Sequence, residues 1–341
     1  MTIEFNREDR ICRFLNPFNN FEQSEAKCQV RWDPLTHRTG RLAHFAGVRP
    51  PEADLSKIIE GSATNCPFCP ENLPAMTPKF VAGQIPEGRI EKGESTIFPN
   101  LLPYDANSAL AVLCKKHYRA LTEFTPQIFT DAFVNCLDYL DRVISDKKAT
   151  FGLVTWNYMP PAASSQVHPH FQVYATETPG NFIPTQMVAS QAYYRKNKRI
   201  YWEDYVESEI QAGERLIKET ASGIWLTDFV SLSALTDIIG IFPHKQTLFD
   251  LSRKEIEDAG RMINSLIYYL GQQGVYSLNM SWMPALQGRK DYWLQLRISP
   301  RLYMAPQVWC TDTPSFFYQY QESFMLWLPE DTAGDIRTFI S

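Results

Sequence analysis

The apolar residues of the chain follow two spacings, one typical of strands and one typical of helices. Residues 109–114 form a continuous apolar run, which predicts a buried strand. A helix is predicted from Pro126, with Thr125 as its N-cap, because apolar residues then recur every three or four positions. Its apolar stripe consists of Phe129, Phe133, Cys136, Leu137, Leu140 and Ile144. Strands are predicted at 151–156 and at 171–175, where β-forming residues predominate.

The same order of elements returns in the second half of the chain. A strand is predicted at 237–242, and a helix begins after Ser252, which forms a capping box with Glu255. The apolar stripe of this helix consists of Ile256, Ala259, Ile263, Leu266, Ile267 and Leu270. Strands follow around 276–280 and at 293–298. Each copy reads as strand, strand, helix, strand, strand. This order predicts an α+β fold in which an antiparallel sheet has helices packed on one face.

The two copies are offset by a nearly constant number of residues. His117 lies 127 positions before His244, and the two predicted helices begin at the same offset. The segment between the copies, residues 178–222, is polar, and a helix is predicted at 205–218. The repeat favours one pseudo-symmetric body over two loosely tethered domains.

Two of the six histidines stand one residue apart, next to the strand predicted at 171–175. Side chains two positions apart on a strand share a face, so His168, His170 and Gln172 are expected on one side. The second copy has Gln295 and Arg297 where the first has the two histidines. The repeated scaffold therefore does not require histidines there, which favours a chemical role over the simpler interpretation of two partly exposed strand residues.

A Cys-x-x-Cys motif at Cys66 and Cys69, with a proline after each cysteine, predicts a tight turn that directs both sulfurs to one ion. A redox pair is the alternative, but redox motifs open a helix in a βαβ unit, and these flanks are rich in loops. With His117 and His168, the pair supplies two sulfurs and two nitrogens, a tetrahedral zinc set.

The composition and charge of the chain limit the classes of partner that it is expected to bind. The chain has 341 residues, 44% of them hydrophobic and 21% charged, with a formal net charge of −5. It has no block of basic residues, so neither nucleic acid nor a membrane surface is an expected partner. No apolar run approaches the length of a membrane-spanning helix, and the first ten residues do not resemble a signal peptide. Seven cysteines, an odd number, indicate reduced thiols, and a cytoplasmic location is expected.

Taken together, these motifs resemble the histidine-triad superfamily, and specifically its galactose-1-phosphate uridylyltransferase branch. The matching segments fall in order across most of the first half: residues 31–36, Arg49-Pro50, residues 66–72, residues 98–100, the turn at His117, Asn157 and residues 168–172. The second half matches mainly in its layout. Its residues 292–296 look more like nucleotide-sugar phosphorylases and uncharacterised relatives.

The resemblance implies two tandem histidine-triad-like units. Residues 1–190 would be a catalytic and zinc-binding unit, and residues 191–341 a degenerate one. His170 would attack the α-phosphorus of a nucleotide sugar, and a sugar 1-phosphate would then accept the nucleotide in a ping-pong reaction. Phosphoryl oxygens would be held by Gln172, Asn157, Ser165 and Arg49, and the base or ribose by Asn100. Cys66, Cys69, His117 and His168 would bind zinc, and the chain would form a homodimer.

Four positions depart from the pattern of the family. Ala46 replaces the first of two arginines, which leaves Arg49, or else Arg38 or Arg41, to bind phosphate. Phe171 stands where a glycine is common, and it is expected to alter the pocket or its neighbours. Gln295 and Arg297 replace the histidines of a second metal site, so no second metal is expected.

Two alternatives to the transferase remain open. One is a phosphorylase or hydrolase of nucleotide sugars or dinucleoside polyphosphates, which would share the covalent intermediate. The other is a catalytically silent module that binds zinc and nucleotides. The sequence does not identify the base, the sugar or the acceptor.

Overall fold

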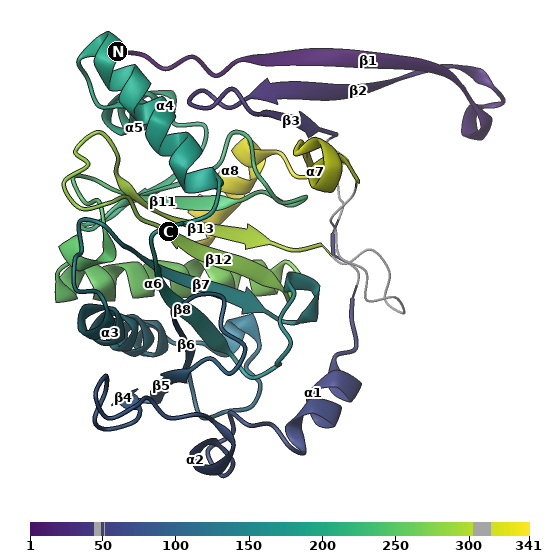
Figure 1. The fold of residues 1–341 in the computed structure, drawn as a ribbon. Coiled ribbons are helices and arrows are strands. Elements are labelled where there is room, and N and C mark those ends of the chain that lie inside the picture. The colour runs from purple at the N-terminus through teal and green to yellow at the C-terminus, as the bar shows by residue number, and fades with distance from the viewer. Residues whose placement is uncertain (44–48, 51, 303–314) are drawn as a thin grey trace.

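A ten-stranded antiparallel sheet forms the centre of the protein (Figure 1). The computed structural model describes residues 1–43, 49–50, 52–302 and 315–341. The strand order in the sheet is β4-β5-β6-β8-β7-β12-β13-β11-β10-β9. The strands span Ile90–Lys92 (β4), Ser95–Pro99 (β5), Asn107–Val112 (β6), Phe151–Tyr158 (β7), His170–Thr176 (β8), Leu216–Glu219 (β9), Ile224–Thr227 (β10), Ile238–Phe242 (β11), Leu278–Met283 (β12) and Leu294–Pro300 (β13).

The order of the strands is the same on both sides of the central β7–β12 pair, as the sequence repeat predicts. The register agrees as well. Val112 pairs with His170, and 127 residues later Ile239 pairs with Arg297. At the centre, β7 and β12 pair with each other directly, for example through Trp156 and Met280. The two halves therefore share one continuous sheet, and backbone hydrogen bonds join them at its middle.

Helices α3 (Pro126–Val143) and α6 (Arg253–Gln272) pack together against one face of this sheet (Figure 1). The apolar stripes predicted for both helices point into the core. The capping box at Ser252 and Glu255 is confirmed, whereas Thr125 occupies its N-cap position without a side-chain hydrogen bond. At Gly260 a Cβ atom would lie 2.9 Å from Oγ1 of Thr130, so glycine permits the close approach of the two helices.

Two further helices, α4 (Phe182–Asn197) and α5 (Tyr201–Ala212), contribute to a second core with the opposite side chains of the sheet, among them Leu226 and Ile241. The predicted helix at 205–218 is wrong at both ends. Helix α5 ends at Ala212, because Gly213 adopts a left-handed φ of 66° at the C-cap. The next residues form the edge strand β9.

A second, four-stranded sheet lies beside the first, in the order β1-β2-β3-β14. Its strands span Arg7–Asn16 (β1), Glu22–Trp32 (β2), Thr39–Leu42 (β3) and Ser323–Met325 (β14). Strands β1 and β2 form a long ribbon that projects from the body (Figure 1).

The remaining helices are α1 (Ser56–Ala63), α2 (Leu73–Met76), α7 (Ser315–Tyr320) and α8 (Pro329–Phe339). Short 3-10 turns span Pro17–Asn19, Leu121–Glu123, Pro160–Ala162 and Leu248–Asp250. In the described parts of the chain, no helix combines the length and the apolar character needed to cross a membrane.

Candidate active site and metal centre

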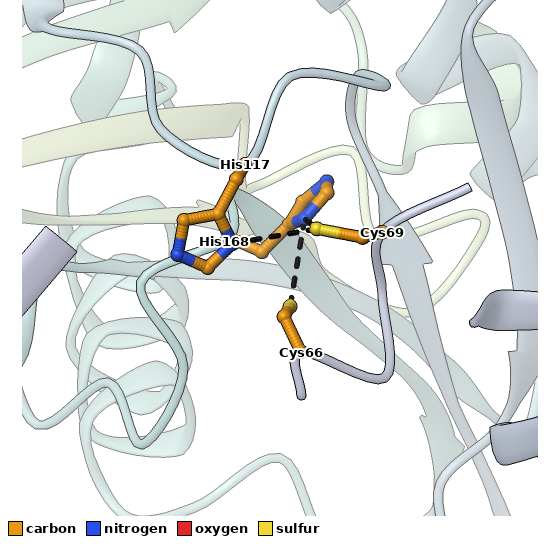
Figure 2. A group of neighbouring side chains, drawn as sticks. All are labelled: Cys66, Cys69, His117 and His168. Atoms are coloured by element: carbon orange, nitrogen blue, oxygen red, sulfur yellow. Dashed lines mark hydrogen bonds between the residues drawn. The ribbon is translucent and has the colours of Figure 1, made fainter. Parts of the chain in front are cut away.

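Four side chains from three segments converge at one end of the first half of the sheet (Figure 2). The ligand atoms of Cys66, Cys69, His117 and His168 all lie within 4.8 Å of one another. Nδ1 of His168 lies 3.7 Å from each sulfur, and Nδ1 of His117 lies 3.5 Å from Sγ of Cys69. Zinc bonds of about 2.3 Å to sulfur and about 2.1 Å to nitrogen, at tetrahedral angles, place these atoms about 3.6 Å apart. The donor set therefore fits a zinc ion.

Hydrogen bonds behind the two imidazoles fix which nitrogen faces the cluster. Nε2 of His168 donates to the carbonyl of Cys114 at 2.7 Å, and Nε2 of His117 lies 3.0 Å from Oγ of Ser62. The Ser62 hydroxyl donates its proton to the carbonyl of Ile58 at 2.6 Å and therefore accepts from His117. Each ring thus carries its proton on Nε2 and its lone pair on Nδ1. Partners of this kind orient metal-binding histidines and hold them in the tautomer that binds.

Burial disfavours the charged forms of two side chains in the cluster. Burial lowers the pKa of His168 to about 4, and burial together with the neighbouring Cys66 raises the pKa of Cys69 to about 12. A thiol held neutral in this way is a poor redox nucleophile, and the motif lies in a loop, four residues before α2. A bound cation would stabilise the thiolates. The cluster therefore favours a metal site over a redox pair.

His170 lies two residues beyond His168, at the start of β8. Its Nδ1 donates to the backbone carbonyl of His168 at 2.8 Å, and burial lowers its pKa. The ring is consequently neutral at physiological pH, with its lone pair on Nε2. The ring of Phe68 packs edge-on against it, with the ring centroids 5.1 Å apart.

A hollow of about 240 Å³ is lined by four of the residues singled out in the sequence, namely Asn100, Ser165, His170 and Gln172. His170 and Gln172 project from the same face of β8, while Phe171 points the other way and stacks on Phe133 of α3. The large residue at position 171 therefore fills the helix-side core and not the hollow.

Asn157 lies on the strand next to His170, one residue beyond the Trp156–Phe171 pair. Its Oδ1 accepts a hydrogen bond from Nδ2 of Asn279 at 2.8 Å. The orientation of the Asn279 amide is set on both sides. Its Oδ1 accepts from Arg301 at 2.9 Å, and its Nδ2 also donates to the carbonyl of Ala162 at 3.0 Å. Asn157 therefore keeps its Nδ2 as a donor.

The predicted arginines lie elsewhere. Arg49 lines a different hollow, together with Tyr118 and Tyr276. Arg38 bonds to Ser323 and the carbonyl of Val230.

Arg41, Ala46 and Arg297 were also singled out in the sequence. Arg41 pairs with Glu322, and Ala46 lies outside the described residues. In the second half, Arg297 is buried between Asp228 and Asp237, with Nη1 2.5 Å and 2.6 Å from their carboxylates.

Three contributors were not identified from the sequence. Ser62 and the carbonyl of Cys114 support the ligand histidines, and Asn279 orients Asn157. The two supporting groups are ordinary loop and helix residues without a motif. Asn279 comes from the second copy, where the repeat directed attention to positions 295 and 297 instead.

The fold is that of uridylyltransferases and a nucleotide-sugar phosphorylase. A solved uridylyltransferase matches with a TM-score of 0.65 and 17% identity, over 91% of this chain and 98% of that chain. The ADP-glucose phosphorylase of Arabidopsis thaliana, solved with bound ADP-glucose, matches with a TM-score of 0.69 and 15% identity, over the same shares. The resemblance in fold inferred from the sequence motifs is thus confirmed, together with the α+β class.

A relative of similar length exists in Archaeoglobus fulgidus. It is an uncharacterised protein, 28% identical over 338 residues, and the alignment covers 98% of each chain. No family model matches the sequence.

Proposed function

We propose that this chain is a nucleotidyltransferase that moves a nucleoside monophosphate from a nucleotide sugar to a sugar 1-phosphate through a covalent nucleotidyl-His170. One observation carries the proposal. His170 donates Nδ1–H to the carbonyl of His168, so the lone pair of Nε2 is available in a hollow shared with Ser165 and Gln172. A neutral imidazole that is held in place and desolvated is a competent nucleophile.

The reaction has two displacements. In the first, Nε2 of His170 forms a bond to the α-phosphorus, and the bond to the bridging oxygen breaks, so sugar 1-phosphate leaves with the electron pair. The Nδ1 proton stays on the ring, and the carbonyl of His168 stabilises the positive charge that develops there. In the second, a phosphate oxygen of the acceptor attacks the same phosphorus, and His170 leaves as a neutral imidazole.

The developing charge on the phosphoryl oxygens needs donors. We assign this role to the amides of Gln172 and Asn157 and to Ser165, while Asn100 would contact the base or ribose. Arg49, which lies at another hollow, would have to move to reach the phosphates.

Cys66, Cys69, His117 and His168 would hold zinc, which would neutralise the thiolates and fix the His168 ring. On this proposal, residues 1–190 form the catalytic unit and residues 191–341 support it, and the chain acts as a homodimer.

Self-labelling tests the covalent intermediate. Incubation with UDP-glucose or ADP-glucose, followed by intact-protein mass measurement, should add the mass of one nucleoside monophosphate per chain, acid-labile and alkali-stable. His170→Asn should abolish the added mass. His37→Asn is the matched control, because His37 has a φ of 59°, which asparagine tolerates. Equal labelling of the wild-type protein and His170→Asn would contradict the proposal.

The likeness to the ADP-glucose phosphorylase favours a second candidate, in which orthophosphate is the acceptor. The labelled enzyme separates the candidates when it is mixed with galactose 1-phosphate, orthophosphate or buffer alone. A transferase releases the label fastest to the sugar phosphate, a phosphorylase to orthophosphate, and a hydrolase to water. A silent nucleotide-binding module would show thermal stabilisation by nucleotide sugars without labelling.

A further inference from the structure

A second hollow lies in the other half of the central sheet, on the same face as His170. Its volume is about 220 Å³, similar to the hollow of about 240 Å³ at His170. Strands β12 and β13 form its floor, and α7 and β14 contribute to its wall. Phe171 and Ile298 both point into the helix-side core, so their neighbours His170 and Arg297 lie on the opposite face of the sheet.

This second hollow is the counterpart, in the repeat, of the hollow at His170. The residues 127 positions beyond His170 and Gln172 are Arg297 and Ser299. The pairing of strands agrees with this offset, as described for β8 and β13 above. Both Arg297 and Ser299 line the second hollow. The second half has therefore kept the hollow and exchanged the two side chains that would face a phosphoryl group.

The guanidinium of Arg297 has hydrogen-bonding capacity that the protein does not use. The residue is 6% exposed, and its Nη1 donates both hydrogens, to Asp228 at 2.5 Å and to Asp237 at 2.6 Å. Its Nε is buried and has no hydrogen-bond partner among the described residues. An unsatisfied buried donor is costly. Nε and Nη2 together form the edge of a guanidinium that binds one phosphate or carboxylate through two parallel hydrogen bonds.

The charges around the second hollow favour an anion. Of the described residues that line it, Arg297 and Arg301 are basic and none is acidic. The carboxylates of Asp228 and Asp237 lie behind this lining, where Arg297 and Arg38 balance their charge. Asp237 also accepts hydrogen bonds from two backbone amides, and Asp228 accepts one. Arg301 therefore leaves the lining with an excess of positive charge.

We propose that this hollow binds a phosphate monoester, either a nucleoside monophosphate or a sugar phosphate, as a second ligand site of the chain. The phosphate group lies at Arg297 and Ser299, and the organic group lies against Phe317 and Phe324, two aromatic residues of the wall. Phe317 is 38% exposed and so has surface left to cover. A guanidinium has no lone pair with which to attack phosphorus, so the ligand is held without reaction.

Calorimetric titration of the full chain with AMP, UMP, galactose 1-phosphate and inorganic phosphate tests this inference. The titrations use a Gln172→Glu background, in which a carboxylate repels anions from the hollow at His170, so the second hollow is measured alone. At least one monoester should bind more tightly than inorganic phosphate, because its organic group also covers the two phenylalanines. A preference for AMP or UMP identifies a nucleotide as the ligand, and a preference for galactose 1-phosphate identifies a sugar phosphate.

Two further substitutions locate the binding site. Ser299→Glu places a carboxylate in the second hollow, and Arg297→Lys keeps a cation beside Asp228 and Asp237 but removes the second hydrogen bond to phosphate. Each should weaken binding of the monoester by about tenfold or more. Ser265→Glu is the matched control, because Ser265 is also half-buried but lies on α6, on the other face of the sheet, and it should leave the affinity unchanged.

Three results would overturn the inference. The first is the absence of binding of every monoester at millimolar concentration, and the second is equal affinity for monoesters and inorganic phosphate. The third is an equal effect of Ser299→Glu and Ser265→Glu on the affinity. Circular dichroism of each variant controls for misfolding, and Ser299→Glu carries the test if Arg297→Lys does not fold. Self-labelling of His170 in the wild-type protein concerns the other hollow, so the second ligand site and the reaction fail independently.

Discussion

Replacing Asn279 by aspartate should impair a reaction that occurs on the neighbouring half of the sheet. Asn279 donates Nδ2–H to Asn157, and this bond leaves the Nδ2 of Asn157 as a donor. Aspartate has nearly the same shape but offers only acceptor oxygens, so the amide of Asn157 must turn to donate to it. Asn157 would then present its carbonyl oxygen to the phosphoryl group, and a favourable contact would become a repulsive one.

The expected decrease in rate follows from the loss of one hydrogen-bond donor to the phosphoryl oxygens. Removal of one positioned donor to a developing oxyanion slows a reaction by about 10²–10³-fold. We expect Asn279→Asp to slow nucleotidylation of His170 by about 100-fold, close to the effect of Asn157→Ala. The variant also sets a carboxylate oxygen against the carbonyl of Ala162, a loss of about 1–3 kcal/mol for an unsatisfied buried acceptor. Arg301 remains beside the carboxylate and limits that loss.

Rapid-quench mass measurement of single-turnover labelling gives the rate of nucleotidylation of His170. A double-mutant cycle then tests whether Asn279 acts through Asn157. If Asn279 acts through Asn157, then Asn279→Asp should have little further effect in the Asn157→Ala background. A merely structural role would slow both backgrounds by the same factor, and that result would refute the reasoning. Ser281→Ala serves as the control, because Ser281 lies two residues further along β12 on the same face.

Two further outcomes concern the metal and the stability. Elemental analysis should find about one zinc per chain. Cys66→Ser should lose the metal and lower the melting temperature. Cys12→Ser is the control, because Cys12 is an exposed cysteine, and it should do neither. Burial opposes ionisation of Glu330, but its ion pair with Arg31 outweighs burial and lowers the pKa of Glu330 below 4.5. The pair should therefore stabilise the fold at neutral pH and lose that contribution as the pH falls through the lowered pKa. In urea unfolding, the free energy of unfolding should fall less steeply with decreasing pH for Glu330→Gln than for the wild-type protein.

Features set by local spacing could be predicted from the sequence. The stripes of α3 and α6, the capping box at Ser252 and the repeat around β6 and β11 all follow from periods that one helix or strand imposes on its own residues. The metal cluster could also be predicted, because few residue types bind zinc and this chain has few histidines.

Features set by contacts between distant segments could not be predicted. The helix expected at 205–218 ends early because the chain reverses at Gly213 to add an edge strand. Asn279 reaches Asn157 across 122 residues of sequence, a contact that neither amide indicates alone. Arg49 was placed at the phosphates by a motif, and a motif does not fix the path of the loop that carries it.

The β7–β12 pairing gives the half without the two histidines a structural role. If the second copy were removed, β7 would lie at an open edge, with the backbone groups that now bond to β12 exposed to water. An unprotected edge of this length pairs readily with other chains and promotes aggregation. The second copy thus covers the edge of β7 and protects the first half of the sheet from pairing with other chains.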